Sequence, residues 1–271
     1  MSKFHIITIY RLAIFYFLTI NNYTFGQSLV TIPSTNELTL TSSINKIEYN
    51  LLIALPFDYE NSTKEYPVIY LLDANDDFSL LTSIYRRLQS PNEFKEYVIV
   101  GISYKHYPKY HRRVDYTPSK DVKAEKSGGA QKFVNILSDE VFPTIENKYR
   151  VKESSRTLFG HSLGGLFCSY LLTNNSSLFD NYVVSSPSVW WDNYFILKNL
   201  NSSFSKKAIF LSVGSNETPM MHESYNKLSK FINNNLLTSS KKAITLNGES
   251  HASAKIRAYT DGLRWLFKNS L

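Results

Sequence analysis

Cysteine is nearly absent from this sequence: Cys168 is the only one in 271 residues, so no disulfide can form within the chain. Stability must therefore come from burial of apolar surface, and a zinc site built on cysteines is excluded. The chain also lacks internal repeats and low-complexity linkers. With 43% hydrophobic and 20% charged residues, these absences favour a single globular domain with a sizeable core.

No apolar run is long enough to span a membrane. Lys3 and Arg11 precede the run Leu12–Ile20, whose nine residues fall short of a spanning helix, which needs about 20. This layout, followed by polar residues and Gly26, is typical of a secretory signal peptide. We therefore expect residues 1–26 to be a signal peptide and residues 27–271 to be one domain, periplasmic or secreted, without stable membrane insertion after cleavage. A membrane anchor is the less favoured alternative.

The charge balance is modestly basic. The chain has 30 Lys and Arg against 23 Asp and Glu, a net charge of +7. The first 26 residues hold two of the basic residues and no acidic one, so the mature chain would carry +5. Because no segment interleaves aromatic and basic residues in a recognisable motif, we expect no nucleic-acid partner.

Hydrophobic runs alternate with helical patterns, which predicts βαβ units and a mainly parallel sheet. Strands are predicted at Ile47–Leu55, Pro67–Leu72, Tyr97–Ile102, Arg156–Phe159, Tyr182–Val184, Ala208–Val213 and Ala243–Leu246. Helices are predicted at Phe78–Gln89, Ala130–Lys148 with a possible kink at Pro143, Leu163–Leu172, Tyr225–Leu236 and Ala254–Phe267. Residues 103–127 are so rich in charge and turn formers that they predict a long loop without regular structure.

The segment Gly160–Gly165 contains the pattern G-x-S-x-G between a predicted strand and a predicted helix, with Ser162 at its centre. In that context the pattern indicates a nucleophilic serine held in a strained turn that exposes its hydroxyl. The amide of Leu163, at a helix N-terminus, could donate to the oxyanion formed when Ser162 attacks an ester. A chance pentapeptide in a loop is the alternative.

A second oxyanion donor is expected from the loop after an earlier central strand. Here the backbone amides of Ala74 and Asn75 are the candidates, and the sequence does not choose between them. Both could equally be ordinary turn residues.

The general base should follow the nucleophile in chain order, after the last strand. His251 fits this position, and His222, which follows the preceding strand, is the competitor. Glu217 follows the predicted strand Ala208–Val213 and could orient the imidazole. Glu249 or Asp192 could supply the acid instead, or a Ser–His dyad could work alone.

The stretch after the Tyr97–Ile102 strand could contact an anionic aromatic substrate. It contains the basic residues Lys105, His106, Lys109, His111, Arg112 and Arg113 and the aromatic residues Tyr104, Tyr107 and Tyr110. A solvated basic loop is the plainer alternative, as is an internal pair of Arg113 with Asp115. Trp190 and Trp191 could form the wall of an acyl or aryl pocket or serve ordinary packing.

Several segments together resemble the Putative esterase family, which includes esterase D and the enterobactin-type siderophore esterases. The matching segments are Tyr70–Asp73, Arg113–Pro118, Gly160–Gly165, Ser186–Asp192 and Gly248–His251. The resemblance implies an α/β-hydrolase fold with helices on both faces of the sheet, no cofactor, no metal, and Ser162 and His251 as the catalytic pair. It also implies a small-molecule ester or thioester substrate, such as a siderophore triester, and members of the family differ in their catalytic acid.

We therefore predict a serine carboxylic-ester hydrolase that acts through an acyl-enzyme on Ser162. An acyltransferase of the same fold would use an alcohol instead of water as the acceptor. A non-catalytic module that binds a ligand without turnover is a third possibility.

Overall fold

The computed structural model describes residues 31–89, 95–106, 109–174, 177–198, 207–235 and 238–269. The predicted signal peptide, residues 1–26, lies outside the described residues. Residues Ser34–Leu271 group into one unit, which holds every element named below. The strands are β1 Thr35–Thr41, β2 Glu48–Ala54, β3 Tyr66–Leu71, β4 Val98–Tyr104, β5 Val151–His161, β6 Asn181–Ser185, β7 Lys207–Gly214 and β8 Thr238–Leu246.

Helices follow most of the strands, as the alternating pattern predicts. They are α2 Ala74–Leu88, α3 Lys109–Tyr116, α4 Ala130–Ile136, the π-helix η1 Leu137–Val141, α5 Phe142–Lys148, α6 Leu163–Thr173, α7 Trp191–Tyr194, the 3₁₀-helix η2 Phe195–Leu197, α8 Pro219–Asn235 and α9 His251–Asn269.

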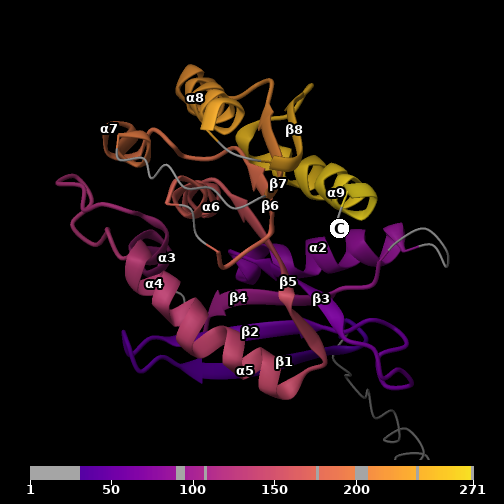
Figure 1. Cartoon of the computed structure of the whole chain (residues 1–271). Helices are drawn as coiled ribbons and strands as arrows, with labels where there is room; N and C mark the ends of the chain where they lie inside the picture. The colour runs from indigo at the N-terminus through magenta and orange to yellow at the C-terminus, as the bar shows by residue number, and fades with distance from the viewer. Residues whose placement is uncertain are drawn as a thin grey trace, which may run out of the picture. The chain divides into compact units, whose positions relative to one another are not determined.

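The strands form one eight-stranded sheet in the order β1-β2-β4-β3-β5-β6-β7-β8 (Figure 1). β2 pairs antiparallel with both β1 and β4, and all pairs from β4 to β8 are parallel. The prediction of a mainly parallel sheet is confirmed. Since parallel strands end at one edge, the loops after β3, β5, β7 and β8 open on the same side of the molecule.

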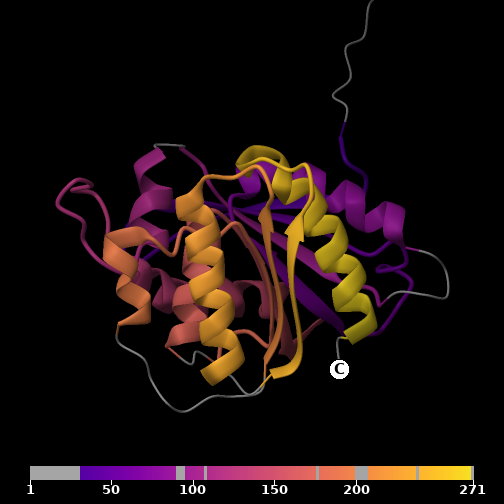
Figure 2. The same ribbon diagram turned by 90° about the horizontal axis from the view of Figure 1, so that it is seen from above.

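The sheet is covered on both faces, as its apolar central strands require. Every residue of β4 and β7 is buried. One face packs against α4, α6 and α8 through residues such as Phe133, Phe167 and Leu228. The other face packs against α2 and α9 through residues such as Phe78 and Leu263. Figure 2 shows α8 and α9 on opposite sides of β7 and β8.

The prediction of a structureless stretch at residues 103–127 is wrong, because helix α3 lies within it. Sequence periodicity misses this helix because its buried contacts are polar. Asp115 of α3 is buried and accepts hydrogen bonds from the hydroxyls of Tyr49 at 2.7 Å and Tyr104 at 3.0 Å. These tyrosines, and not Arg113, are the partners of Asp115, so the expected internal pair does not form.

The predicted helix at 130–148 is present but interrupted, since the π-helix η1 separates α4 from α5. Pro143 stands in the first turn of α5, directly after the π-helical turn, and has no amide to donate to the carbonyls of that preceding turn. The irregularity in this helix is the π-helical turn Leu137–Val141 just before Pro143, and the kink expected at Pro143 stays a prediction. Helix α8 also begins earlier than predicted, at Pro219 rather than Tyr225.

Candidate active site

Ser162 occupies the sharp turn between β5 and α6. Its backbone has φ 59° and ψ −116°, a conformation that is costly for any residue with a side chain. The flanking glycines allow the turn, because a Cβ on Gly160 would lie 2.4 Å from the carbonyl oxygen of Gly164. Amino acids with side chains at Gly160 would therefore force β5 and α6 apart.

His251, the first residue of α9, brings its imidazole to this serine. Its Nε2 lies 3.0 Å from the Ser162 Oγ, and its Nδ1 lies 2.6 Å from Oε2 of Glu217. One ring thus connects the serine with a carboxylate, as general-base activation of a hydroxyl requires. The competitor His222 lies on α8, and its amide donates to the carbonyl of Thr218.

Glu217 follows β7, and its side chain is fully buried. Its Oε1 accepts hydrogen bonds from the Ser186 hydroxyl and, at 2.8 Å, from the Gly214 amide. Burial opposes ionisation, but the hydrogen bonds from His251, Ser186 and Gly214 outweigh it and hold the pKa of Glu217 below its usual value. The carboxylate is therefore charged and fixed where it can orient the imidazole.

The alternative acids stand elsewhere. Glu249 contacts Arg257, with Oε1 3.9 Å from its Nε. Asp192 lies in the short helix α7, where Asp192, Asn193 and Tyr194 all adopt left-handed backbone conformations. The structure thus brings Glu217, and neither of these two carboxylates, to His251.

The candidate oxyanion donors lie at the starts of two helices. Leu163 is the first residue of α6, and Ala74 and Asn75 open α2. Amides in the first turn of a helix have no intrahelical acceptor and can face an anion. The side chain of Asn75 is engaged elsewhere, since it exchanges hydrogen bonds of 3.2 and 3.3 Å with the backbone of Tyr104.

Sequence reasoning missed the pair of Arg112 with Asp73. Arg112 Nε and its terminal nitrogen donate to the two carboxylate oxygens of Asp73 at 2.5 and 2.8 Å. Burial raises the pKa of Asp73, and the nearby Arg112 opposes that rise. Asp73 directly precedes α2, and it lies close to α6, because a Cβ on Gly164 would be 3.3 Å from its Oδ2. The pair therefore anchors α3 to both helices that supply the oxyanion candidates.

His161, the residue before the nucleophile, was also missed. Its ring centroid lies 4.7 Å from that of His251, and its Nδ1 lies 3.1 Å from the Ser185 Oγ. The side chain is buried. Burial, followed by the charges of His251 and Lys255, lowers the pKa of His161 to about 3. The ring is therefore neutral at any pH near neutrality.

Trp190 and Trp191 lie beyond Ser188, whose Oγ is 3.5 Å from that of Ser162. Trp191 is buried, and its indole nitrogen donates to the carbonyl of Ser119. Trp190 is partly buried and packs against the same core. The pair thus follows Ser188 closely in the chain, and Trp191 joins α7 to the loop after α3.

Much of the predicted basic stretch is already paired within the protein. Lys105 and His106 lie 3.1 and 3.4 Å from the carboxylate oxygens of Glu48. Arg113, one of the predicted substrate-binding residues, donates from Nε to the Lys126 carbonyl at 3.0 Å. Tyr107 lies outside the described residues.

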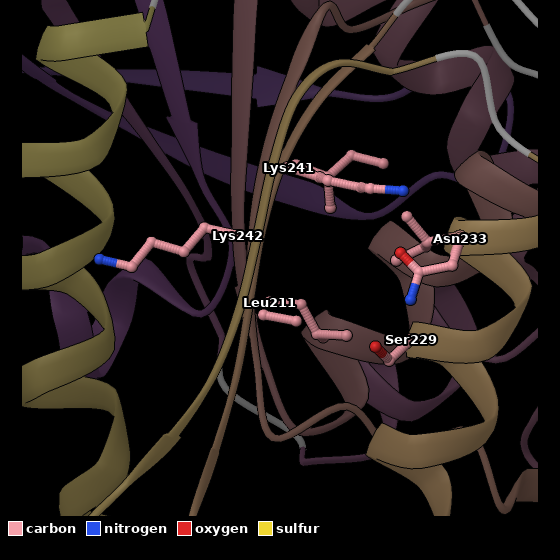
Figure 3. A pocket seen from close by; sticks show the side chains of 8 residues that line it. Leu211, Ser229, Asn233, Lys241 and Lys242 are labelled. Carbon is pink, nitrogen blue, oxygen red and sulfur yellow. The ribbon is translucent and has the colours of Figure 1, made fainter.

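Figure 3 shows a hollow, away from these side chains, between α8 and strands β7 and β8. Its lining residues are Ile209, Leu211, Ser229, Ile232, Asn233, Lys241, Lys242 and Ala243. Lys241 extends toward Asn233 and Ser229, whereas the side chain of Lys242 extends to the opposite side of the strand, toward α9. The hollow contains no member of the predicted active site.

Within the ranges that the structure describes, no three or more His, Cys, Asp or Glu side chains form a group that could hold a metal ion. None of the helices in these ranges is long and apolar enough to cross a membrane.

Comparisons with known proteins identify the family and the fold of this chain. Residues 42–260 match the family described as Putative esterase. The ferri-bacillibactin esterase BesA of Bacillus subtilis is 31% identical over 194 residues, which cover 65% of this chain and 67% of that protein. Among solved structures, the BES protein from Bacillus cereus is 31% identical with a TM-score of 0.80, covering 92% of this chain and all of that one. An IroE-like serine hydrolase from Shewanella oneidensis is 28% identical with a TM-score of 0.75, covering 86% and 80% of the two chains.

Proposed function

The chain belongs to the Putative esterase family, with an α/β-hydrolase fold and carboxylic-ester hydrolase activity, and from that premise we propose that it cleaves its ester through an acyl-enzyme on Ser162. One observation carries the proposal. The imidazole of His251 lies between Ser162 Oγ at 3.0 Å and Glu217 Oε2 at 2.6 Å. This is the arrangement that turns a weakly nucleophilic hydroxyl into an attacking group.

In the first step, Ser162 Oγ attacks the ester carbonyl carbon and its proton passes to Nε2 of His251. The amide of Leu163 and an amide at the start of α2, from Ala74 or Asn75, hold the negative carbonyl oxygen. The bond to the alcohol oxygen then breaks, and Nε2 returns the proton to that oxygen. Glu217 keeps the imidazole in the required tautomer and stabilises its charged form.

In the second step, water takes the place of the alcohol. His251 accepts a proton from the water as it attacks the acyl carbon, and the proton passes to Ser162 Oγ as the acid leaves. An acyltransferase would use another alcohol here. Product analysis with sugar or glycerol present separates the two reactions, because transfer would give an acylated acceptor faster than free acid.

We further propose that the ester belongs to a siderophore. The support comes from the relative in Bacillus subtilis, whose name describes an esterase of ferri-bacillibactin. Trp190, just beyond Ser188, is only partly buried and has an aromatic face of the kind that stacks on aryl rings. A panel of ferric and iron-free catecholate triesters, simple aryl esters and acetylated sugars tests this proposal. Turnover of short aryl esters alone would exclude it.

The decisive test of the serine mechanism is labelling of the purified protein with a fluorophosphonate, followed by peptide mapping. We expect label on Ser162 in the wild type and none in Ser162→Ala or His251→Ala. His222→Ala, in the first turn of α8, serves as the matched control and should label normally. Normal labelling of Ser162→Ala would contradict the mechanism.

We also propose export, with cleavage of the signal peptide near Gly26, on the strength of the charged residues and short apolar run before it. Expression of the full chain in a bacterial host and mass analysis of the recovered protein test this. A protein that keeps its first 26 residues would contradict the proposal.

A further inference from the structure

The imidazole of His251 is exposed to solvent, although its position between Ser162 and Glu217 must be accurate. It belongs to the first residue of α9, and 43% of its side-chain surface is exposed. Its hydrogen bonds to Ser162 and Glu217 lie along the ring edge. What resists rotation of the ring out of this line must therefore act on its face.

His161 lies against that ring. The two ring centroids are 4.7 Å apart and the planes are tilted by 40°, within the range of packed aromatic pairs. His161 is only 8% exposed, whereas its neighbour Ser162 must be open to substrate. The buried ring of His161 thus packs against the more exposed ring of His251 and supports it.

Three contacts fix His161 itself. It ends the central strand β5, where it pairs in register with Ser185 of β6. The Ser185 hydroxyl is also the partner of His161 Nδ1, at 3.1 Å. A terminal nitrogen of Arg112 lies 3.4 Å from the His161 carbonyl oxygen. These contacts therefore hold His161 to the sheet and to α3, whereas His251 belongs to α9.

The charge of His161 matters as much as its shape. The groups whose charges act on it are His251 and Lys255 from α9, Arg112 from α3 and Glu217 from the loop after β7. Burial, followed by the charge of Lys255 and that of His251 when it is protonated, lowers the pKa of His161 to about 3, so the ring is uncharged when His251 gains its proton. A cation at this distance would oppose that protonation.

We propose that His161 is a positioning residue, whose neutral ring backs the imidazole of His251 and keeps it aligned between Glu217 and Ser162. The inference rests on the proposed serine mechanism. Its effect should be largest in the acyl-enzyme, because acylated Ser162 has no hydroxyl proton to donate to Nε2. Until water arrives, Glu217 and the face of His161 are then the contacts that hold the ring.

Two variants separate the ring from its hydrogen bond. His161→Asn keeps a polar group for Ser185 but removes the ring. The double variant His161→Phe/Ser185→Ala keeps a flat ring and removes the hydroxyl that would lose its partner. We expect His161→Asn to lower kcat by about 10- to 100-fold with KM within about twofold, and to accumulate acyl-enzyme. The double variant should recover most of the lost kcat, and His222→Asn is the matched control.

A second readout does not depend on turnover. The proton that His251 Nδ1 donates to Glu217 should give a low-field proton resonance in the resting wild-type protein. We expect this signal to broaden or move upfield in His161→Asn and to return in the double variant, with thermal unfolding showing that all variants are folded.

The outcomes distinguish the role of His161 from the serine mechanism itself. Wild-type kcat and an unchanged resonance in His161→Asn would overturn the inference, as would a folded double variant that is as impaired as His161→Asn. Absence of fluorophosphonate label on wild-type Ser162 would instead refute the serine mechanism, while the resonance would still report whether His161 holds the ring.

Discussion

Oε2 of Glu217 lies 2.6 Å from Nδ1 of His251, and the Glu217 side chain has no solvent exposure. An ionised carboxylate in such a place is stabilised by the groups around it, here the amide of Gly214 and the hydroxyl of Ser186. Buried hydrogen bonds therefore stabilise the charged form of this one carboxylate. This argues against a site that works with serine and histidine alone.

Replacement of Glu217 by Gln should lower kcat by about 10²- to 10⁴-fold with little change in KM, because the neutral amide no longer stabilises the protonated ring of His251. Steady-state kinetics on an aryl ester would measure this. Glu249→Gln, in the adjoining loop, is the matched control and should stay near wild type. If Glu217→Gln lost less than about threefold, a dyad would be the better description.

Replacement of Asp115 by Asn should raise the free energy of unfolding above that of the wild type, and this gain should be larger at neutral pH than at acid pH. Burial raises the pKa of Asp115 to about 6, against the hydrogen bonds from Tyr49 and Tyr104. Protonated Asp115 therefore favours folding below the unfolded pKa of about 4, and this stability is lost as the pH rises through about 6. Above that pH, the free energy of unfolding of the variant should exceed that of the wild type by up to about 3 kcal/mol more than it does at acid pH.

Urea unfolding of wild type and Asp115→Asn at several pH values between 4 and 8 measures that difference. Asp58→Asn, at an exposed site, is the control and should show no such pH dependence. A constant difference across the range would contradict the assignment.

Replacement of Asp77 by Asn should loosen α9 from α2. The buried carboxylate of Asp77 on α2 accepts hydrogen bonds from Lys255 Nζ at 2.5 Å and the Tyr259 hydroxyl at 2.9 Å, both on α9. We expect the free energy of unfolding to fall by about 2–4 kcal/mol, and to recover partly when Lys255→Met is added. Chemical unfolding tests this, with the exposed Lys268→Met as control. A loss below about 0.5 kcal/mol would show that the pair is dispensable.

Replacement of Arg112 by Met should destabilise the protein by about 3–5 kcal/mol, because it leaves the buried carboxylate of Asp73 without a cation. Arg113→Met is the matched control on the next residue, since the side chain of Arg113 donates to the backbone carbonyl of Lys126 and not to a carboxylate. Thermal unfolding at neutral pH would compare the two variants. Equal effects would indicate that helix α3, and not the charge pair, determines the result.

The sequence predicts the central elements well because their signals are local. The strand before Gly160, the turn at Ser162 and the helix after it follow from apolar runs and a spaced glycine pattern. His251 and Glu217 follow from their places after late strands. Strand β1, by contrast, is mostly exposed along its length, and its polar residues give no apolar signal.

The missed residues depend on orientation, which spacing alone does not contain. Arg112 and Arg113 are neighbours in a basic stretch, and only the direction of α3 turns Arg112 toward Asp73 and leaves Arg113 at the surface. Likewise, His161 fills a position that the serine pattern leaves unspecified, and its role emerges only when α9 lies above it.

Ser162 and His251 are 89 residues apart in the chain, and the sheet that joins them grows by parallel pairing from β5 through β8. Such non-local pairings form slowly, since each must close a long loop before it gains contacts. On the proposed serine mechanism, Ser162 therefore becomes reactive only after the last strand has docked and His251 has reached it. During refolding, the rate at which Ser162 becomes reactive toward a fluorophosphonate should consequently report the completion of the sheet, later than signals from the helices alone.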